Sequence, residues 1–82
     1  MADDVAKRVK EVTARILKID VNDIDDTAEF VKDLGAESIQ SIELVAAFEE
    51  EFDIEMDEDE ALDVKSVDNA IEFITKVVAE QH

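Results

Sequence analysis

The chain has 82 residues, so residues 1–82 are expected to form a single domain around one small hydrophobic core. A hydrophobic content of 46% argues against intrinsic disorder, and a formal net charge of −16 at pH 7 argues against a nucleic-acid partner. The absence of cysteine excludes disulfides and thiolate metal sites, and no segment approaches the run of about 20 apolar residues that spans a bilayer, so we expect a cytoplasmic protein without an integral membrane segment.

A helix is predicted from Asp3 to Lys18. Val5, Val9, Val12 and Ile16 follow one another at i, i+4, i+7 and i+11, which is the spacing that places side chains on one face of an α-helix. This face is expected to contact the core.

The segment from Ile19 to Ala36 shows no helical period and is predicted to be a long structured loop. Its apolar residues are expected to fold back onto the core; they are Ile24, Phe30, Val31 and Leu34. The only glycine, Gly35, can adopt the positive φ that most residues avoid, so it is predicted to make a sharp turn.

A second helix is predicted from Glu37 or Ser38 to Phe52. Its core face is expected to consist of Ser41, Leu44, Val45, Phe48 and Phe52. The opposite face alternates apolar residues with carboxylates, at Ile39, Glu43, Ala46 and Glu50. Between Glu37 and Asp63 there are twelve acidic residues and no basic residue, which favours a binding surface for basic partners.

Two further helices are predicted. A short one spans about Asp59 to Asp63, with Ala61, Leu62 and Val64 turned inward. The last runs from Val67 to Ala79 after a Ser66 N-cap, with Val67, Ile71, Ile74 and Val78 on one stripe. The predicted fold class is therefore all-α: a small bundle of three main helices plus one short helix, with a long structured loop after the first helix.

Catalytic and metal-binding patterns are missing from the sequence. The only histidine, His82, is expected to lie in a frayed end, where it would be a poor catalytic base. Asp57, Asp59 and Glu60 are spaced as in a calcium-binding loop, but Leu62 stands where that loop requires glycine. We therefore expect neither an enzyme nor a metal site.

Ser38 is the hydroxyl that calls for an explanation. Serine is a preferred N-cap residue, and Ser38 follows a predicted turn. A hydroxyl at a helix N-terminus is also a suitable position for a phosphate ester, because free backbone N–H groups and the helix dipole favour negative charge there. Ser41 faces the core, so Ser38 is the better attachment point, and its two roles are compatible.

The stretch "DLGAESIQSIELVAAFEEEFDIEM" resembles acyl carrier proteins, whose usual motif D-L-G-A-D-S-L precedes an acidic helix and E-E-E-F. The similarity extends from Val9 to Ile74. It implies that Ser38 bears a 4'-phosphopantetheine arm, donated by coenzyme A, whose thiol carries acyl groups as thioesters between enzymes of fatty-acid or related synthesis. It also implies an acyl pocket between the helices, lined by Phe30, Leu44, Val45, Phe48, Leu62 and Ile71.

The resemblance further implies a docking surface on the second helix. Its expected members are Glu37, Ile39, Glu43, Ala46, Glu49 and Glu50. The implied partners of this monomer are a phosphopantetheinyl transferase and acyl-transfer and chain-elongation enzymes with basic docking patches. Glu37, Ile39 and Ala46 depart from the Asp, Leu and Met that are usual in the family, which suggests a specialised carrier for a dedicated pathway.

Two alternatives remain open from the sequence. One is a stand-alone aminoacyl or peptidyl carrier of polyketide or non-ribosomal peptide assembly, although such carriers usually have a glycine before the serine, where this chain has Glu37. The other is an acidic helical adaptor in which Ser38 is only an N-cap.

Overall fold

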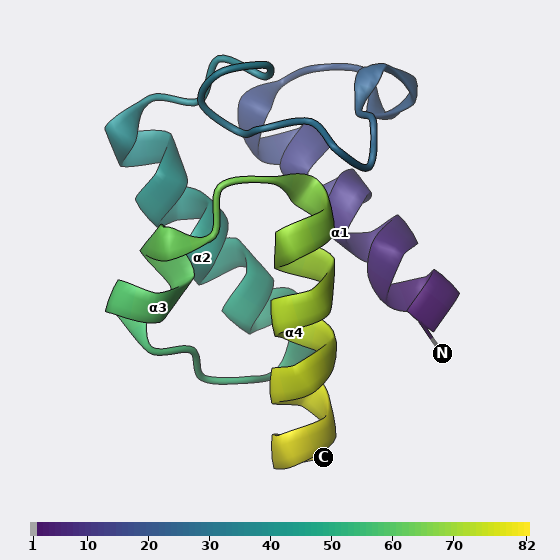
Figure 1. Cartoon of the computed structure of the whole chain (residues 1–82), viewed down its shortest axis with the longest axis vertical. Helices are drawn as coiled ribbons and strands as arrows, with labels where there is room; N and C mark the ends of the chain where they lie inside the picture. The colour runs from purple at the N-terminus through teal and green to yellow at the C-terminus, as the bar shows by residue number, and fades with distance from the viewer. Residues whose placement is uncertain (1) are drawn as a thin grey trace.

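The computed structural model describes the backbone of residues 2–82 and the side chains from residue 5 onward. Its elements are α1 (Ala2–Leu17), the 3-10 turn η1 (Val21–Asp23), α2 (Ser38–Phe52), α3 (Glu58–Asp63) and α4 (Val67–Gln81). Within this part of the chain the β-type pairing is limited to one isolated bridge, between Glu29 and Ser66. The predicted all-α bundle with one short helix is therefore confirmed (Figure 1).

The hydrophobic core lies where α1 contacts both α2 and α4. One buried cluster contains Val9 and Val12 of α1 together with Val67 and Ile74 of α4, as the predicted stripes require. The core residues of α2 are Leu44, Phe48 and Phe52. Burying one such side chain contributes about 1.5–3 kcal/mol, so these few residues supply much of the stabilisation of a small domain.

Arg8 joins α1 to the end of α2. Its Nε donates to Glu51 Oε2 at 2.8 Å, and its Nη2 donates to the Glu51 carbonyl oxygen. The guanidinium carbon also lies 4.4 Å from the centroid of the Phe52 ring. The last carbonyl groups of a helix have no partner within the helix, so Arg8 satisfies one of them while it packs on an aromatic ring.

The connection between α1 and α2 folds onto the core as predicted, but only some of its apolar residues take part. Lys18 ends α1 with φ 59°, and Ile24 and Phe30 are buried. Leu34 is half-buried, whereas Val31 is 64% exposed. The expectation that Val31 packs on the core is wrong, because the chain turns over residues 31–34 and leaves most of this side chain in contact with solvent.

A seam of backbone hydrogen bonds, which we define as residues 28–30 with 65–67, holds this connection against the start of α4. Phe30 N–H donates to the Lys65 carbonyl at 2.9 Å, and Val67 N–H donates to the Ala28 carbonyl at 2.9 Å. The bridge between Glu29 and Ser66 lies between these two bonds. In Figure 1 the connection crosses the upper end of the bundle, where α4 begins.

The last residues pack on the connection between α2 and α3. Helix α4 continues to Gln81, two residues beyond the predicted Ala79, and the Gln81 amide bonds both backbone groups of Glu55, at 2.9 and 2.7 Å. His82 Nε2 lies 2.8 Å from the carbonyl oxygen of Asp53. A carbonyl oxygen only accepts, so Nε2 is the donor. The expectation of a frayed end at His82 is wrong for this reason.

Replacing Arg8 is expected to loosen the contact between α1 and α2. Arg8→Ala should lower the free energy of unfolding by about 1–2 kcal/mol, because it removes a half-exposed ion pair, a carbonyl hydrogen bond and a cation–π contact. Arg15→Ala is the matched control, since Arg15 is an exposed arginine of the same helix. Urea unfolding followed by circular dichroism measures both; equal losses would contradict the role assigned to Arg8.

Candidate functional site

Helix α2 begins with a cap that does not use Ser38. Glu37 occupies the N-cap position with extended backbone angles, and its N–H donates to Gln40 Oε1 at 2.9 Å. Ser38 is the first helical residue and is exposed. The hypothesis that Ser38 serves as the N-cap is therefore wrong, and its hydroxyl is available for another role.

Gly35 sets the direction in which α2 starts. It has φ +71°, as its predicted turn requires. Directly after it, Ala36 is buried and its N–H donates to the Phe30 carbonyl at 2.8 Å. The turn is thereby anchored to the seam through Phe30, and α2 leaves the connection at a defined angle with Ser38 on the outside.

The surroundings of Ser38 fit a phosphate ester. The side chain is exposed, and the first turn of α2 holds no acidic residue, although the carboxylate of the N-cap residue Glu37 stands beside it. The N–H groups and the positive dipole end of a helix of this length favour negative charge at that point. Ser38 therefore combines accessibility with a helix N-terminus, which suits covalent attachment of a phosphate-containing group.

A cavity of about 350 Å³ opens between α2, α3, α4 and the connection. Five of the residues expected in an acyl pocket lie together in its wall: Phe30, Leu44, Val45, Phe48 and Leu62. Ile71, the sixth, is not among the lining residues; α4 instead contributes Ala70, Phe73 and Ile74. Successive helical residues are rotated by roughly 100°, which turns Ile71 away from the face that these three share.

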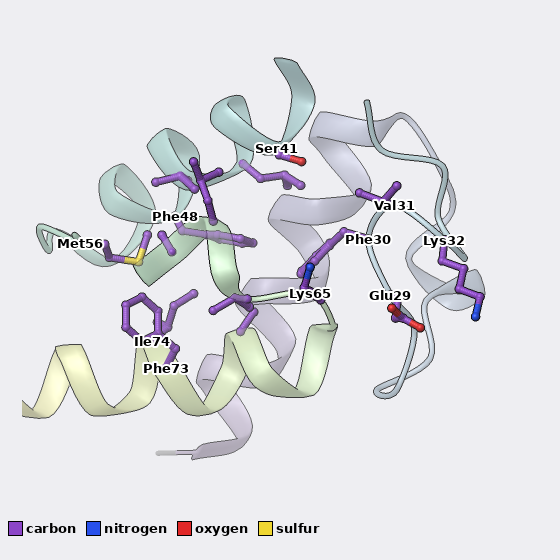
Figure 2. Close-up of a pocket in the computed structure, with 16 residues that line it drawn as sticks. Glu29, Phe30, Val31, Lys32, Ser41, Phe48, Met56, Lys65, Phe73 and Ile74 are labelled. Carbon is purple, nitrogen blue, oxygen red and sulfur yellow. The ribbon is translucent and has the colours of Figure 1, made fainter. Parts of the chain in front are cut away.

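The cavity has an apolar end and a polar end. Figure 2 shows Phe48, Met56, Phe73 and Ile74 at one end and Lys65, Glu29 and Lys32 toward the other. Sequence reasoning missed Met56 and Phe73. The spacing of Ala70, Phe73 and Ile74 at i, i+3 and i+4 was the available signal for the α4 wall, although it does not distinguish a cavity from a filled core.

The predicted docking residues of α2 separate into two groups. Ile39, Glu43, Ala46 and Glu50 are exposed on one face, and Glu43, Ala46 and Glu50 border a shallow groove against Arg15 and Ile16 of α1. Glu37 is exposed at the cap. Ile42, which was not predicted, is also 55% exposed and adds apolar surface.

Glu49 has a different environment from the other predicted docking residues. Its Oε2 accepts a hydrogen bond from the Met56 N–H at 2.9 Å, and the residue is half-buried. Glu49 thus holds the segment between α2 and α3, which includes one residue of the cavity wall. Periodicity could not indicate this contact, because it depends on where the following loop lies.

Neither a metal-binding cluster nor a membrane-spanning helix is found in the part of the chain that the structure describes. Among the side chains from residue 5 onward, no group of three or more histidine, cysteine or carboxylate residues is arranged to hold a metal ion. None of the helices described there has the length and apolar character needed to cross a membrane.

The chain is similar in sequence to a known protein family and to named bacterial proteins. Residues 7–74 match a family model described as "Phosphopantetheine attachment site". A protein of Caulobacter vibrioides strain NA1000 / CB15N named "Acyl carrier protein" is 42% identical over 76 residues, which cover 93% of this chain and 97% of that protein. The protein of the same name from Caulobacter vibrioides strain ATCC 19089 is similar to the same extent, 42% over 76 residues.

Substitution of Gly35 tests the turn that presents Ser38. Gly35→Ala should lower the free energy of unfolding by about 1 kcal/mol, because the strain of a left-handed alanine exceeds the gain from a less flexible unfolded chain. A Cβ at this position would meet no atom within 4 Å, so the effect reports backbone strain alone. Gly35→Asn should cost less, since asparagine tolerates positive φ. Thermal unfolding of both variants would contradict this account if alanine were the better tolerated residue.

Proposed function

This chain belongs to the acyl carrier protein family, whose members hold 4'-phosphopantetheine, and we propose that Ser38 is the residue that bears the arm here. The observation that carries the proposal is the position of Ser38: an exposed first residue of α2, outside the capping interaction of Glu37 and Gln40. Ser41, the other serine of the helix, lines the cavity and is half-buried. Only Ser38 combines exposure with the helix N-terminus.

The attachment joins Ser38 Oγ to the phosphate of the arm in a phosphodiester, with loss of the hydroxyl proton and of the nucleotide part of coenzyme A. The arm supplies a thiol for thioester formation, which this chain, free of cysteine, does not itself contain. The chain contributes an accessible oxygen and N–H groups that favour the phosphate charge. The catalytic groups for attachment and acyl transfer belong to the partner enzymes, so the chain acts as a carrier.

The cavity is the proposed shelter for the acyl chain. Its walls include Leu44, Phe48 and Ile74, and its volume of about 350 Å³ lies at the lower end of the range for small-molecule sites. Apolar walls favour the alkyl part of a thioester by removing it from water, at about 25 cal/mol per Å² of buried surface. An acyl group of moderate length is the cargo that this cavity supports.

The exposed face of α2 is the proposed docking surface for partner enzymes. Ile39 offers an apolar contact beside the arm, and Glu43 and Glu50 offer carboxylates to a basic patch. Exposed ion pairs contribute only about 0–1 kcal/mol each, so binding is fast, weak and sensitive to salt. The residues Glu37, Ile39 and Ala46, which depart from the usual family pattern, lie at this surface and favour a dedicated pathway.

Intact-protein mass spectrometry tests the attachment site. After incubation with coenzyme A and a promiscuous phosphopantetheinyl transferase, the wild-type chain should gain one phosphopantetheine increment, and Ser38→Ala should gain none. Ser41→Ala is the matched control and should gain the increment, because it removes a hydroxyl one turn away on the same helix. Modification of Ser38→Ala would assign the arm to another residue.

Charge reversal tests the docking surface. Glu43→Lys should lower kcat/KM of the transferase about tenfold, because it replaces an attractive contact with a repulsive one of similar size. Glu80→Lys is the matched control: Glu80 is an exposed residue of α4, outside the docking face, and the change in net charge is the same. Equal losses for the two variants would attribute the effect to net charge rather than to this surface.

A further inference from the structure

Two of the eight basic residues of the chain, Lys32 and Lys65, lie in the wall of the apolar cavity. In a chain with a net charge of −16, cations are scarce, and the ion pairs found among the described residues involve Arg8 and Lys10 instead. Neither the Lys65 nor the Lys32 ammonium forms an ion pair with another described residue. Lys65 lies beside Phe30 in the cavity, whereas Lys32 lies further out (Figure 2), so Lys65 is the free donor at the polar end of the cavity.

The backbone of Lys65 is held firmly although its side chain is exposed. Its carbonyl accepts the Phe30 N–H at 2.9 Å, and the next residue, Ser66, pairs with Glu29 across the seam. Figure 2 shows the Lys65 side chain beside Phe30, at the opposite end of the cavity from Met56. The seam thus fixes the point from which a cationic donor extends.

The direction in which a cargo enters follows from the same geometry. Ser38 and Ser41 are three residues apart on α2 and so are neighbours on the helix surface, and Ser41 lines the cavity. An acyl chain attached through an arm on Ser38 enters at the Ser41 end and extends toward Met56 and Phe73. Its thioester, and the carbons next to it, then remain at the polar end with Lys65.

We propose that Lys65 is a specificity-determining residue that favours acyl groups carrying a neutral oxygen, a hydroxyl or a keto group, on a carbon close to the thioester. This inference rests on the proposed role of Ser38. An ammonium group offers three donors and no acceptor, and a charge-assisted hydrogen bond is about twice as strong as a neutral one. A fully saturated chain places only CH₂ groups there and leaves the ammonium without this partner.

The oxygen is neutral rather than anionic because of the other charges of the chain. At this end of the cavity the Glu29 carboxylate and the Lys32 ammonium offset each other in charge, and the chain as a whole repels anions. A carboxylate cargo would meet this repulsion, whereas a hydroxyl or keto oxygen accepts from Lys65 without adding charge. The selected class is therefore oxygenated acyl groups without a second acid function.

The test compares two cargoes of equal length, one fully saturated and one with a hydroxyl on the third carbon, each loaded on the arm and verified by intact mass. The hydroxylated cargo should give the higher Tm in the wild-type chain. Lys65→Met keeps a side chain of similar length without a donor, and it should reduce this Tm difference by about 4–8 °C, the shift for one hydrogen bond in a domain of this size.

Two control variants complete the design. Lys76→Met removes the same charge from an exposed position of α4 outside the cavity wall and should keep the wild-type difference, as should Lys65→Arg, which retains a cationic donor. An unchanged Tm difference in Lys65→Met would overturn the role of Lys65 alone. A wild-type chain that gains no phosphopantetheine mass on incubation with a cognate transferase would overturn the attachment at Ser38 and this inference together.

Discussion

The backbone hydrogen bonds of the seam are the interaction on which the rest of the structure depends. They tie Phe30 to Lys65 and Ala28 to Val67, which are far apart in the chain, and so give a long connection a defined path. Ordering such a connection costs conformational entropy at every residue, and buried Phe30 and Ile24 help to offset that cost. The Ala36 N–H is in turn hydrogen-bonded to Phe30. The seam therefore also fixes the position of the start of α2, where Ser38 lies.

The core and the cavity share their residues. Leu44, Phe48 and Ile74 are buried core residues and also line the cavity, so the space proposed for a cargo is space that tighter packing would otherwise fill. A small domain with a net charge of −16 already has self-repulsion to overcome, and a cavity adds lost contacts to that burden. Contacts at the periphery compensate in part. Arg8 joins α1 to α2, and Gln81 holds the loop beside α3.

The helical periodicity of the sequence predicted the main helices well. Each of them buries a continuous stripe, such as Val9 and Val12 in α1, so the ends of the helix follow from the local sequence. The predictions that were wrong concern features that depend on contacts between segments. The cap at Glu37 depends on the turn before α2, and the exposure of Val31 depends on how the connection folds. Ile71 belongs to the predicted stripe of α4, yet the cavity lies on the adjoining face, which only the position of α3 and the connection defines. The resemblance to a known family pointed to Ser38; spacing alone left its role open.

The two roles proposed for helix α2 lie on two of its faces. Leu44 and Phe48 face the cavity, whereas Glu43 and Ala46 are exposed on the other side and take no part in the core. Substitutions at sites that share no partner have nearly additive effects on stability. Under the proposed function, partner recognition and cargo capacity would therefore be separable traits that vary independently within one helix of 15 residues. A protein engineer can redirect such a domain to a new enzyme by exchanging its outer face, and descendants of one ancestral sequence can diverge in their enzymes while they retain the same cargo.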